Sequence, residues 1–221
     1  LPVCEDVWSP PCATHLAQKG AELLLVPNGS PFEVDKFHQR LDLARQRVHE
    51  CGLPIAYVNQ VGGQDELVFD GGSFVMNRDG SLAHLLPFWR DALVLSRWTQ
   101  AAGRYHCEGE AHWTQEPRLA SVYSAMVLGL RDYARKNGFR GVVLGLSGGI
   151  DSALTAAVAV DALGADCVRG VRLPSRFTSH ASMADATESA TSLGIHLDTV
   201  SIDATVATAE STLEPLFSGS A

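Results

Sequence analysis

A glycine-rich stretch in the second half of the chain has the residue types that bind phosphate. Residues 144–154 are LGLSGGIDSAL, an apolar run, two glycines and then a helical pattern. Gly148 and Gly149 let the backbone turn tightly and approach an anion. Ser147 and Ser152 offer hydroxyl donors, and the start of the helix offers free N–H groups. We therefore expect phosphate binding here, and the alternative is a plain glycine-rich turn.

Asp151 lies where a phosphate-binding loop usually carries lysine. A carboxylate is a poor phosphate ligand by itself. It is suited to the site if Mg²⁺ lies between the carboxylate and the phosphate oxygens, because Mg²⁺ prefers one or two carboxylates together with phosphates. We expect Asp151 to be a Mg²⁺ ligand.

Cys4 is the second candidate for chemistry. It ends a short apolar run and is followed by two carboxylates, in LPVCEDVW. Such a cysteine is a nucleophile if a neighbouring group takes its proton, and the alternative is a buried core cysteine. His106, Cys107 and His112 lie close in sequence but fit no common zinc spacing, so we expect a structural or surface role for them.

The composition is that of an ordinary globular protein. The 221 residues suffice for one large domain or two small ones, and 46% are hydrophobic and 19% charged. A net charge of −8 argues against nucleic acid as the main partner. Five scattered cysteines without a CxxC pair favour a reducing compartment, so we expect a cytoplasmic location. No apolar run approaches the roughly 18 residues of a membrane span.

The elements that position Cys4 are mixed helices and strands. The patterns predict helices over 16–22 and 35–51, strands over 23–28, 54–62 and 91–98, and a hairpin over 73–77 and 81–86. This mixture favours an α+β or layered sandwich arrangement. Residues 97–117 lose the pattern, and we interpret them as a linker.

The elements that position the glycine-rich stretch alternate regularly. Helices are predicted over 118–136, 150–163, 180–193 and 203–215, and strands over 141–146, 167–174 and 195–202. This alternation implies a parallel sheet with covering helices, a doubly wound α/β domain. Ligands of such domains bind beyond the carboxyl ends of the strands, which is where residues 147–152 lie.

The SGGxDS string at 147–152 resembles the ATP pyrophosphatase, or PP-loop, family, whose members adenylylate a substrate and release pyrophosphate. The flanking residues 129–164 and 171–195 are similar to NAD⁺ synthetases. The resemblance implies that residues 171–179 lie near adenine and an active-site lid. It also implies ATP and Mg²⁺ as ligands, and an ATP site formed by Ser147, Gly148, Gly149, Asp151, Ser152, Arg172 and Leu173.

Three N-terminal stretches resemble the nitrilase-like glutaminase domain of glutamine-dependent NAD⁺ synthetases. They are CEDVW at 4–8, VPNGSPFEVDK at 26–36 and the long stretch at 57–80. The resemblance implies that Cys4 attacks the glutamine amide, forms a thioester and releases ammonia. The implied glutamine-binding residues are Glu5, Trp8, Ser30 and Lys36. Glu5 would suit the α-ammonium, Lys36 a carboxylate and Trp8 an apolar wall.

The resemblance also implies a fold and a division of the chain. Residues 1–96 would be the C-terminal half of a nitrilase-like α/β sandwich, and 97–117 a linker. Residues 118–221 would be the first half of a doubly wound, adenine nucleotide α-hydrolase-like domain. The nitrilase family places a catalytic Glu and Lys upstream of its cysteine, and only three residues precede Cys4. We therefore expect the chain to be an internal piece of a longer polypeptide.

The implied activity is ATP-dependent amidation of deamido-NAD⁺ to NAD⁺ through an adenylylated carboxylate, with ammonia from glutamine. The implied partners are glutamine, deamido-NAD⁺ and ATP. We expect a homo-oligomer with no nucleic acid and no membrane partner. The alternatives are another PP-loop amidotransferase, and a nucleotide-binding fragment without activity.

Overall fold

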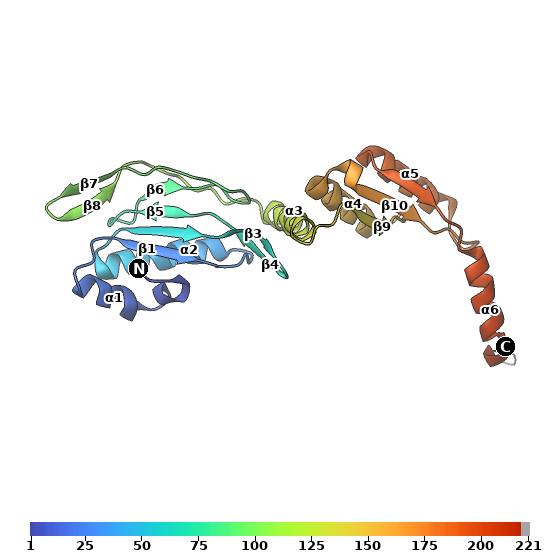
Figure 1. Ribbon diagram of the computed structural model, residues 1–221, viewed down its shortest axis with the longest axis horizontal. Helices are drawn as coiled ribbons and strands as arrows, with labels where there is room; N and C mark the ends of the chain where they lie inside the picture. The colour runs from blue at the N-terminus through green and yellow to red at the C-terminus, as the bar shows by residue number, and fades with distance from the viewer. Residues whose placement is uncertain (218–221) are drawn as a thin grey trace. The chain divides into compact units, whose positions relative to one another are not determined.

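The computed structural model describes residues 1–217 (Figure 1). The residues form two compact units, Leu1–Tyr133 and the part of the chain from Ala134 onward. Helix α3 (Arg118–Lys136) crosses the boundary between them. Within residues 1–217, no helix is long and apolar enough to cross a membrane.

The first unit is built on a four-stranded sheet with the order β1-β2-β5-β6. β1 and β2 are parallel, with α2 as the crossover between them, and the other neighbours are antiparallel. β3–β4 and β7–β8 are separate antiparallel hairpins. Before α3, the elements are η1 (Cys4–Val7), α1 (Pro10–Gln18), β1 (Leu24–Asn28), α2 (Lys36–Cys51), β2 (Ile55–Asn59), β3 (Val61–Gln64), β4 (Leu67–Asp70), β5 (Phe74–Met76), β6 (Leu82–Leu85), β7 (Trp98–Ala101) and β8 (Arg104–Cys107).

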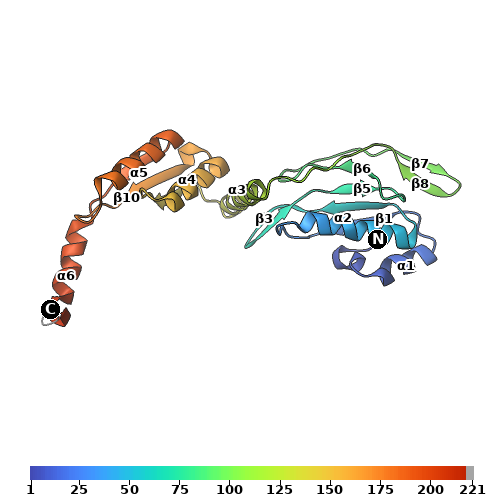
Figure 2. The same ribbon diagram turned by 180° about the vertical axis from the view of Figure 1, so that it is seen from behind.

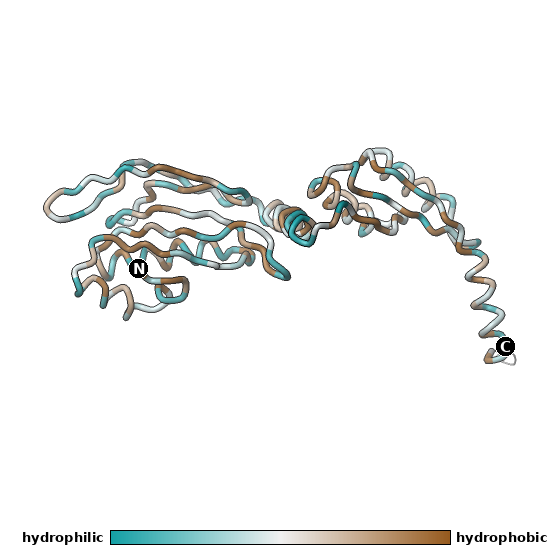
Figure 3. The backbone as a smooth tube through the Cα atoms, in the orientation of Figure 1, coloured by the Kyte–Doolittle hydropathy of each residue, from teal (hydrophilic) through white to brown (hydrophobic). Residues whose placement is uncertain are grey.

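The core of this unit lies between the sheet and the helices α1 and α2, which pack beside each other (Figures 1 and 2). Burial alternates along β1, so Leu24 and Val26 face the core while Leu25 faces outward. From α2, Leu41 and Val48 meet them at helical spacing. Each such fully buried side chain contributes roughly 1.5–3 kcal/mol. Figure 3 shows hydrophobic stretches along these strands.

Several boundaries in this unit differ from the predicted ones. The first α-helix begins at Pro10 rather than at residue 16. This start is compatible with proline, which is well tolerated in the first turn of a helix. The strand expected over 54–62 is two strands, β2 and β3, with a break at Gln60. The strand predicted over 91–98 is wrong: residues 91–97 are not in a strand, and Leu93 and Leu95 are over 90% exposed.

The segment interpreted as a linker, 97–117, contains the hairpin β7–β8. Its two-residue turn has φ of 51° at Ala102 and 71° at Gly103. Positive φ at both central positions is the type I′ geometry that matches the twist of a hairpin. Cys107 at the end of β8 is fully buried against Val75 and Ala83 of the sheet.

The second unit confirms the predicted alternation of strands and helices. Its three strands form a parallel sheet with the order β11-β10-β9. Alanines on the inner faces of α4 and α5 are buried, which lets the two helices pack closely. Gly164 and Gly194 end these helices as predicted. The elements are β9 (Val142–Gly145), α4 (Ile150–Leu163), η2 (Ala165–Cys167), β10 (Val168–Arg172), α5 (His180–Leu193), β11 (His196–Thr199) and α6 (Asp203–Phe217).

Candidate functional site

The predicted phosphate-binding loop lies between β9, which ends at Gly145, and α4, which begins at Ile150. Ser152, in the first turn of α4, turns back onto the loop. Its Oγ accepts a hydrogen bond from the Ser147 N–H at 3.1 Å and lies 3.0 Å from Ser147 Oγ. The Gly149 N–H donates to Ser147 Oγ at 3.2 Å. Four of the predicted residues therefore form a compact loop at the carboxyl end of a parallel strand and the N-terminus of a helix.

Gly148, the fourth of these residues, packs directly on α5. Its N–H donates to Ser182 Oγ at 3.1 Å, and a Cβ added at Gly148 would lie 2.6 Å from Ser182 Cα. Glycine is therefore required here for close approach of the backbone. Sequence reasoning missed Ser182. A signal was present in the sequence, because Ser179 directly precedes the helix predicted over 180–193, where serine is a typical N-cap. In the structure Ser179 is the N-cap of α5, and its Oγ accepts the Ser182 N–H at 3.1 Å, so Ser182 lies in the first turn.

A cavity of about 430 Å³ borders the loop. Its lining includes three predicted residues, Ser147, Arg172 and Leu173, together with Ser182. Its size is within the range of small-molecule sites. Of the predicted loop residues Ser147 lines this cavity, and it meets there Arg172 at the end of β10 and Leu173 directly after it.

Arg172 has protein partners at this cavity. Its Nε donates to Thr199 Oγ1 at 2.7 Å, which connects β10 to β11. Its Nη1 donates to the Met183 carbonyl at 3.0 Å and to Thr187 Oγ1 at 2.7 Å, which connects β10 to α5. The guanidinium is therefore held in place at the wall of the cavity.

Asp151 is exposed in the first turn of α4, where a negative charge suits the helix dipole. Within residues 1–217 its carboxylate accepts no hydrogen bond from another residue. No group of three or more His, Cys, Asp or Glu side chains in the described part of the chain is placed to hold a metal ion. A single free carboxylate fits Mg²⁺ that arrives with a nucleotide, since phosphate oxygens and water supply the other ligands.

Cys4 is the first residue of η1 and has φ of 48°, in the left-handed region. This conformation is strained for a residue with a Cβ, and such strain is concentrated at functional sites. The turn is held by the Asp6 carboxylate, whose Oδ2 accepts the Val3 N–H at 2.8 Å. The thiol is half-buried, and all five cysteines of the chain are free.

The residues predicted to bind glutamine differ in their environment. Lys36, at the start of α2, has its Nζ 5.6 Å from the centroid of the Trp8 ring, so these two side chains lie together. The same Nζ donates to Glu33 Oε1 at 2.6 Å. Glu5 is exposed, whereas Ser30 is only 5% exposed.

Sequence reasoning missed the buried polar residues around Ser30. Arg40, Asn59 and Asp70 lie within hydrogen-bond distance of Ser30 or of each other. Burial raises the pKa of Asp70, and the Arg40 guanidinium opposes that rise. Burial likewise raises the pKa of Tyr57 to about 12. A weak signal was present in the sequence, since a polar residue inside an apolar strand pattern is expected to have buried partners.

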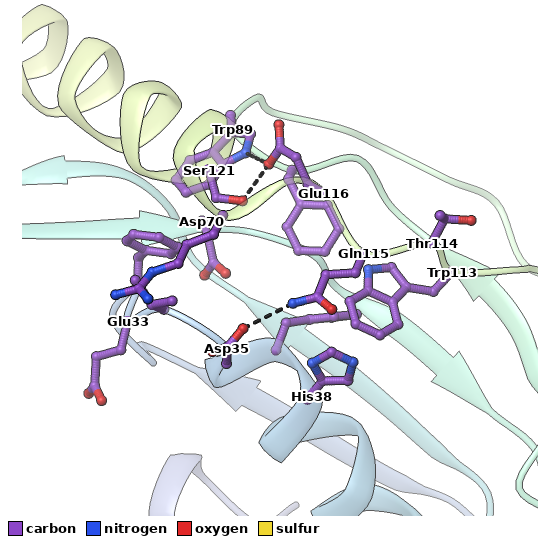
Figure 4. A pocket seen from close by; sticks show the side chains of 15 residues that line it. Glu33, Asp35, His38, Asp70, Trp89, Trp113, Thr114, Gln115, Glu116 and Ser121 are labelled. Carbon is purple, nitrogen blue, oxygen red and sulfur yellow. Dashed lines mark hydrogen bonds between the residues drawn. The ribbon is translucent and has the colours of Figure 1, made fainter.

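The first unit also contains an aromatic cavity of about 330 Å³, shown in Figure 4. Trp89 Nε1 and Ser121 Oγ both donate to Glu116 Oε2, at 3.1 and 2.9 Å. Gln115 Nε2 donates to Asp35 Oδ1 at 3.0 Å. The side chains along the wall thus pair with each other, and nothing in the sequence pattern predicted this cavity.

Two protein families match different segments of the chain. Residues 1–102 match the carbon-nitrogen hydrolase family, and residues 122–218 match the NAD synthase family. Each of the two segments is thus similar to one of these families. The predicted order, a nitrilase-like α/β segment followed by an NAD synthase segment, is confirmed.

Curated proteins that are similar to nearly the whole chain include glutamine-dependent NAD(+) synthetases. The relative from Rhodobacter capsulatus is 49% identical over 221 residues, which are 100% of this chain and 40% of that protein. The relative from Acinetobacter baylyi is 40% identical over 215 residues, 97% of this chain and 39% of that protein. The chain thus spans about 40% of the length of these curated relatives.

Two solved structures support the fold. The glutamine-dependent NAD⁺ synthetase from Acinetobacter baumannii, in complex with adenosine diphosphate, matches with a TM-score of 0.91 and 40% identity. The match covers 99% of this chain and 41% of that chain. The enzyme from Cytophaga hutchinsonii matches with a TM-score of 0.78 over 98% of this chain and 40% of that one, at 21% identity, and this similarity concerns the fold alone.

Proposed function

We propose that this protein takes part in the ATP-dependent amidation of deamido-NAD⁺ to NAD⁺, with ammonia released from glutamine at Cys4. The observation that carries the proposal is the loop Ser147–Ser152, which is closed by its own serines beside a cavity at the end of a parallel sheet. The curated relatives are glutamine-dependent NAD(+) synthetases, and one solved relative holds adenosine diphosphate.

The loop suits adenylylation of a carboxylate. A nicotinate carboxylate oxygen would attack the α-phosphorus of ATP, and pyrophosphate would leave. Backbone N–H groups and the hydroxyls of Ser147 and Ser152 would hold the leaving phosphates, with the N-terminus of α4 directed at their charge. Asp151 would hold Mg²⁺, which offsets the phosphate charge when it is bound with ATP. Arg172 and Leu173 would border the nucleotide at the other wall of the cavity.

The second half-reaction consumes ammonia. Its nitrogen would attack the carbonyl carbon of the acyl adenylate, AMP would leave, and the amide of NAD⁺ would form. Activation is necessary because a free carboxylate is a poor acyl donor, whereas AMP is a good leaving group.

Cys4 suits the release of ammonia from glutamine. Its thiol would give up its proton and attack the carbon of the side-chain amide, and that proton would reach the nitrogen as ammonia leaves; water would then hydrolyse the thioester to give glutamate. The left-handed backbone at Cys4 holds the thiol on a tight turn. Trp8 and Lys36, which lie together, are the proposed apolar wall and carboxylate partner for glutamine. Glu5 and Ser30 are the proposed polar contacts.

The test uses the native-length enzyme and measures NAD⁺ formation from deamido-NAD⁺, ATP and Mg²⁺, with either glutamine or ammonium as the nitrogen source. Cys4→Ala should abolish the glutamine reaction and leave the ammonium reaction intact. Cys12→Ala removes another half-buried free cysteine and is the matched control; it should keep both reactions. If the wild type forms no NAD⁺ from either source, the proposal is wrong. Pyrophosphate release with other carboxylate acceptors would then identify a different amidotransferase.

Other expectations stay predictions. They are the homo-oligomeric state, the lack of nucleic acid or membrane partners, the cytoplasmic location, and the division of the chain at 1–96, 97–117 and 118–221.

A further inference from the structure

Arg40, a charged residue of α2, is almost completely buried, with 1% of its surface exposed. Its Nη1 donates to the two carboxylate oxygens of Asp70 at 2.8 and 2.9 Å. Its Nε donates to Ser30 Oγ at 3.1 Å, and its Nη2 donates to the Ser30 carbonyl at 2.8 Å and the Pro31 carbonyl at 3.0 Å. All three nitrogens of the guanidinium are therefore engaged, mostly with the segment that leads from β1 to α2.

Asn59 holds the same segment from the other side. The Ser30 N–H donates to Asn59 Oδ1 at 3.0 Å, and Asn59 Nδ2 donates back to the Ser30 carbonyl at 3.2 Å. Asn59 is the last residue of β2 and pairs in register with Asn28, the last residue of β1. The N–H, the carbonyl and the hydroxyl of Ser30 are thus all held by side chains that belong to other elements.

The network also sets the hydrogen-bonding role of the Ser30 hydroxyl. A hydroxyl has one donor hydrogen and two acceptor lone pairs. Because Ser30 Oγ already accepts the Arg40 Nε–H, its hydrogen points away from the guanidinium. The Ser30 hydroxyl thus keeps its own hydrogen as a donor, and a side-chain hydrogen bond with Ser30 is among the influences that lower the pKa of the buried Tyr57 phenol.

The Ser30 segment lies next to the proposed glutamine contacts. It leads directly into α2, whose first residue, Lys36, lies over the ring of Trp8. η1, which begins at Cys4, packs against both β1 and α2. The Arg40 guanidinium also opposes the rise that burial causes in the pKa of Tyr57, a buried phenol of β2. Arg40 thus holds the segment that leads into Lys36, one of the proposed glutamine contacts.

We propose that Arg40 is a positioning residue for glutamine recognition, acting through Ser30. The inference rests on the proposed function, since it assumes that glutamine binds beside Cys4. Its physical basis is that a planar fork of N–H donors holds two successive carbonyls, a hydroxyl and a carboxylate at once, which a lysine ammonium does not reproduce. The competing explanation is a buried ion pair with Asp70 that serves the fold alone.

The test compares Arg40→Gln and Arg40→Lys in the native-length enzyme, with glutamine or ammonium as the nitrogen source. Arg40→Gln should raise the KM for glutamine about 10- to 100-fold, the effect of losing one or two charged hydrogen bonds. The ammonium-dependent rate should stay within about twofold. Arg40→Lys should give a smaller rise, because lysine keeps the charge for Asp70 and loses the fork.

Arg47→Gln is the matched control. Arg47 is also buried in α2, with 3% exposed, and in the described part of the chain Glu50 is the only hydrogen-bond or ion-pair partner of its side chain. The variant should lower thermal stability and leave the KM for glutamine within about twofold. If the Arg40 and Arg47 variants lower the glutamine and ammonium rates equally, in proportion to lost stability, Arg40 serves the fold alone and the inference is overturned.

Ser30→Ala tests the route through Ser30 and keeps the inference falsifiable if Arg40→Gln fails to fold. Ser30→Ala should itself raise the KM for glutamine, and combining it with Arg40→Lys should add little, because both changes disturb the same contact. Independent, additive effects would overturn the route through Ser30. A wild type without any glutamine reaction would instead refute the proposed function.

Discussion

Gly148→Ala tests the close packing between the proposed phosphate-binding loop and α5. The added Cβ would lie 2.6 Å from Ser182 Cα and 3.0 Å from the Ser182 carbonyl oxygen. Both atoms are backbone, so no side-chain rotation relieves the clash. The loop and the first turn of α5 must therefore separate by close to 1 Å, the difference from ordinary van der Waals contact.

Two effects follow from this separation. Overpacking of this kind costs about 1–3 kcal/mol of the free energy of unfolding. The displacement also weakens the hydrogen bond from the Gly148 N–H to Ser182 Oγ and moves the N–H groups proposed to hold phosphate. A misplacement of about 1 Å in a reacting site costs on the order of 100-fold in rate. We therefore expect a fall of that order in pyrophosphate release by the native-length enzyme.

Gly145→Ala is the matched control. Gly145 is three residues upstream at the end of β9, and a Cβ added there meets nothing within 4 Å. This variant should keep the rate within about twofold and unfold at the wild-type temperature. The assay is pyrophosphate release under saturating ATP, together with thermal unfolding followed by circular dichroism. If the two alanine variants behave alike, the close packing at Ser182 has no role in the site.

Two further predictions concern titration and metal binding. Burial raises the pKa of Tyr57 to about 12 from its ordinary 10.0, so below pH 10 the phenol is protonated in both the folded and the unfolded chain. Above pH 10 the unfolded chain ionises first and stability falls, by about 1 kcal/mol at pH 11. Urea unfolding at pH 9 and pH 11 should show this loss, and Tyr57→Phe should lack that part of it; the same loss in both would contradict the raised pKa. Asp151→Asn keeps the side-chain shape and removes the charge, so the Mg²⁺ concentration for half-maximal pyrophosphate release should rise about 10-fold. Asp166→Asn, an exposed carboxylate in η2, should leave it unchanged, and an equal response in both variants would argue against Asp151 as the metal ligand.

Local chemistry made the second unit predictable. The residues of the proposed phosphate-binding loop are close together in the chain, and a strand followed by two glycines and a helical pattern leads to one local structure. The C-terminal end of α4 lies at Gly164 as predicted, and that of α5 at Gly194, because glycine readily adopts the backbone conformations that end a helix. Regular alternation of strands and helices then implied a parallel sheet, which the structure confirms.

In the first unit, two predictions differ from the structure because burial and strand pairing are not visible in the sequence pattern: the strand over 91–98 and the linker over 97–117. The apolar stretch over 91–97 has the composition of a strand, yet Leu93 and Leu95 are exposed and the segment pairs with no strand in the described part of the chain. The hairpin β7–β8 forms in a polar segment because its turn residues adopt positive φ and Cys107 is buried against the sheet. Composition alone carries neither fact.

The sequence by itself indicated the residue types at the centre of both candidate sites, because the runs at 4–8 and 147–152 are short and their members are neighbours in the chain. Only the tertiary structure decided what holds those residues in place. Ser182 meets Gly148 across 34 positions, and Arg40 joins Ser30 to Asp70 across ten and 30 positions. Such contacts depend on which helix packs against which strand, and a buried polar group takes whatever partner that packing supplies.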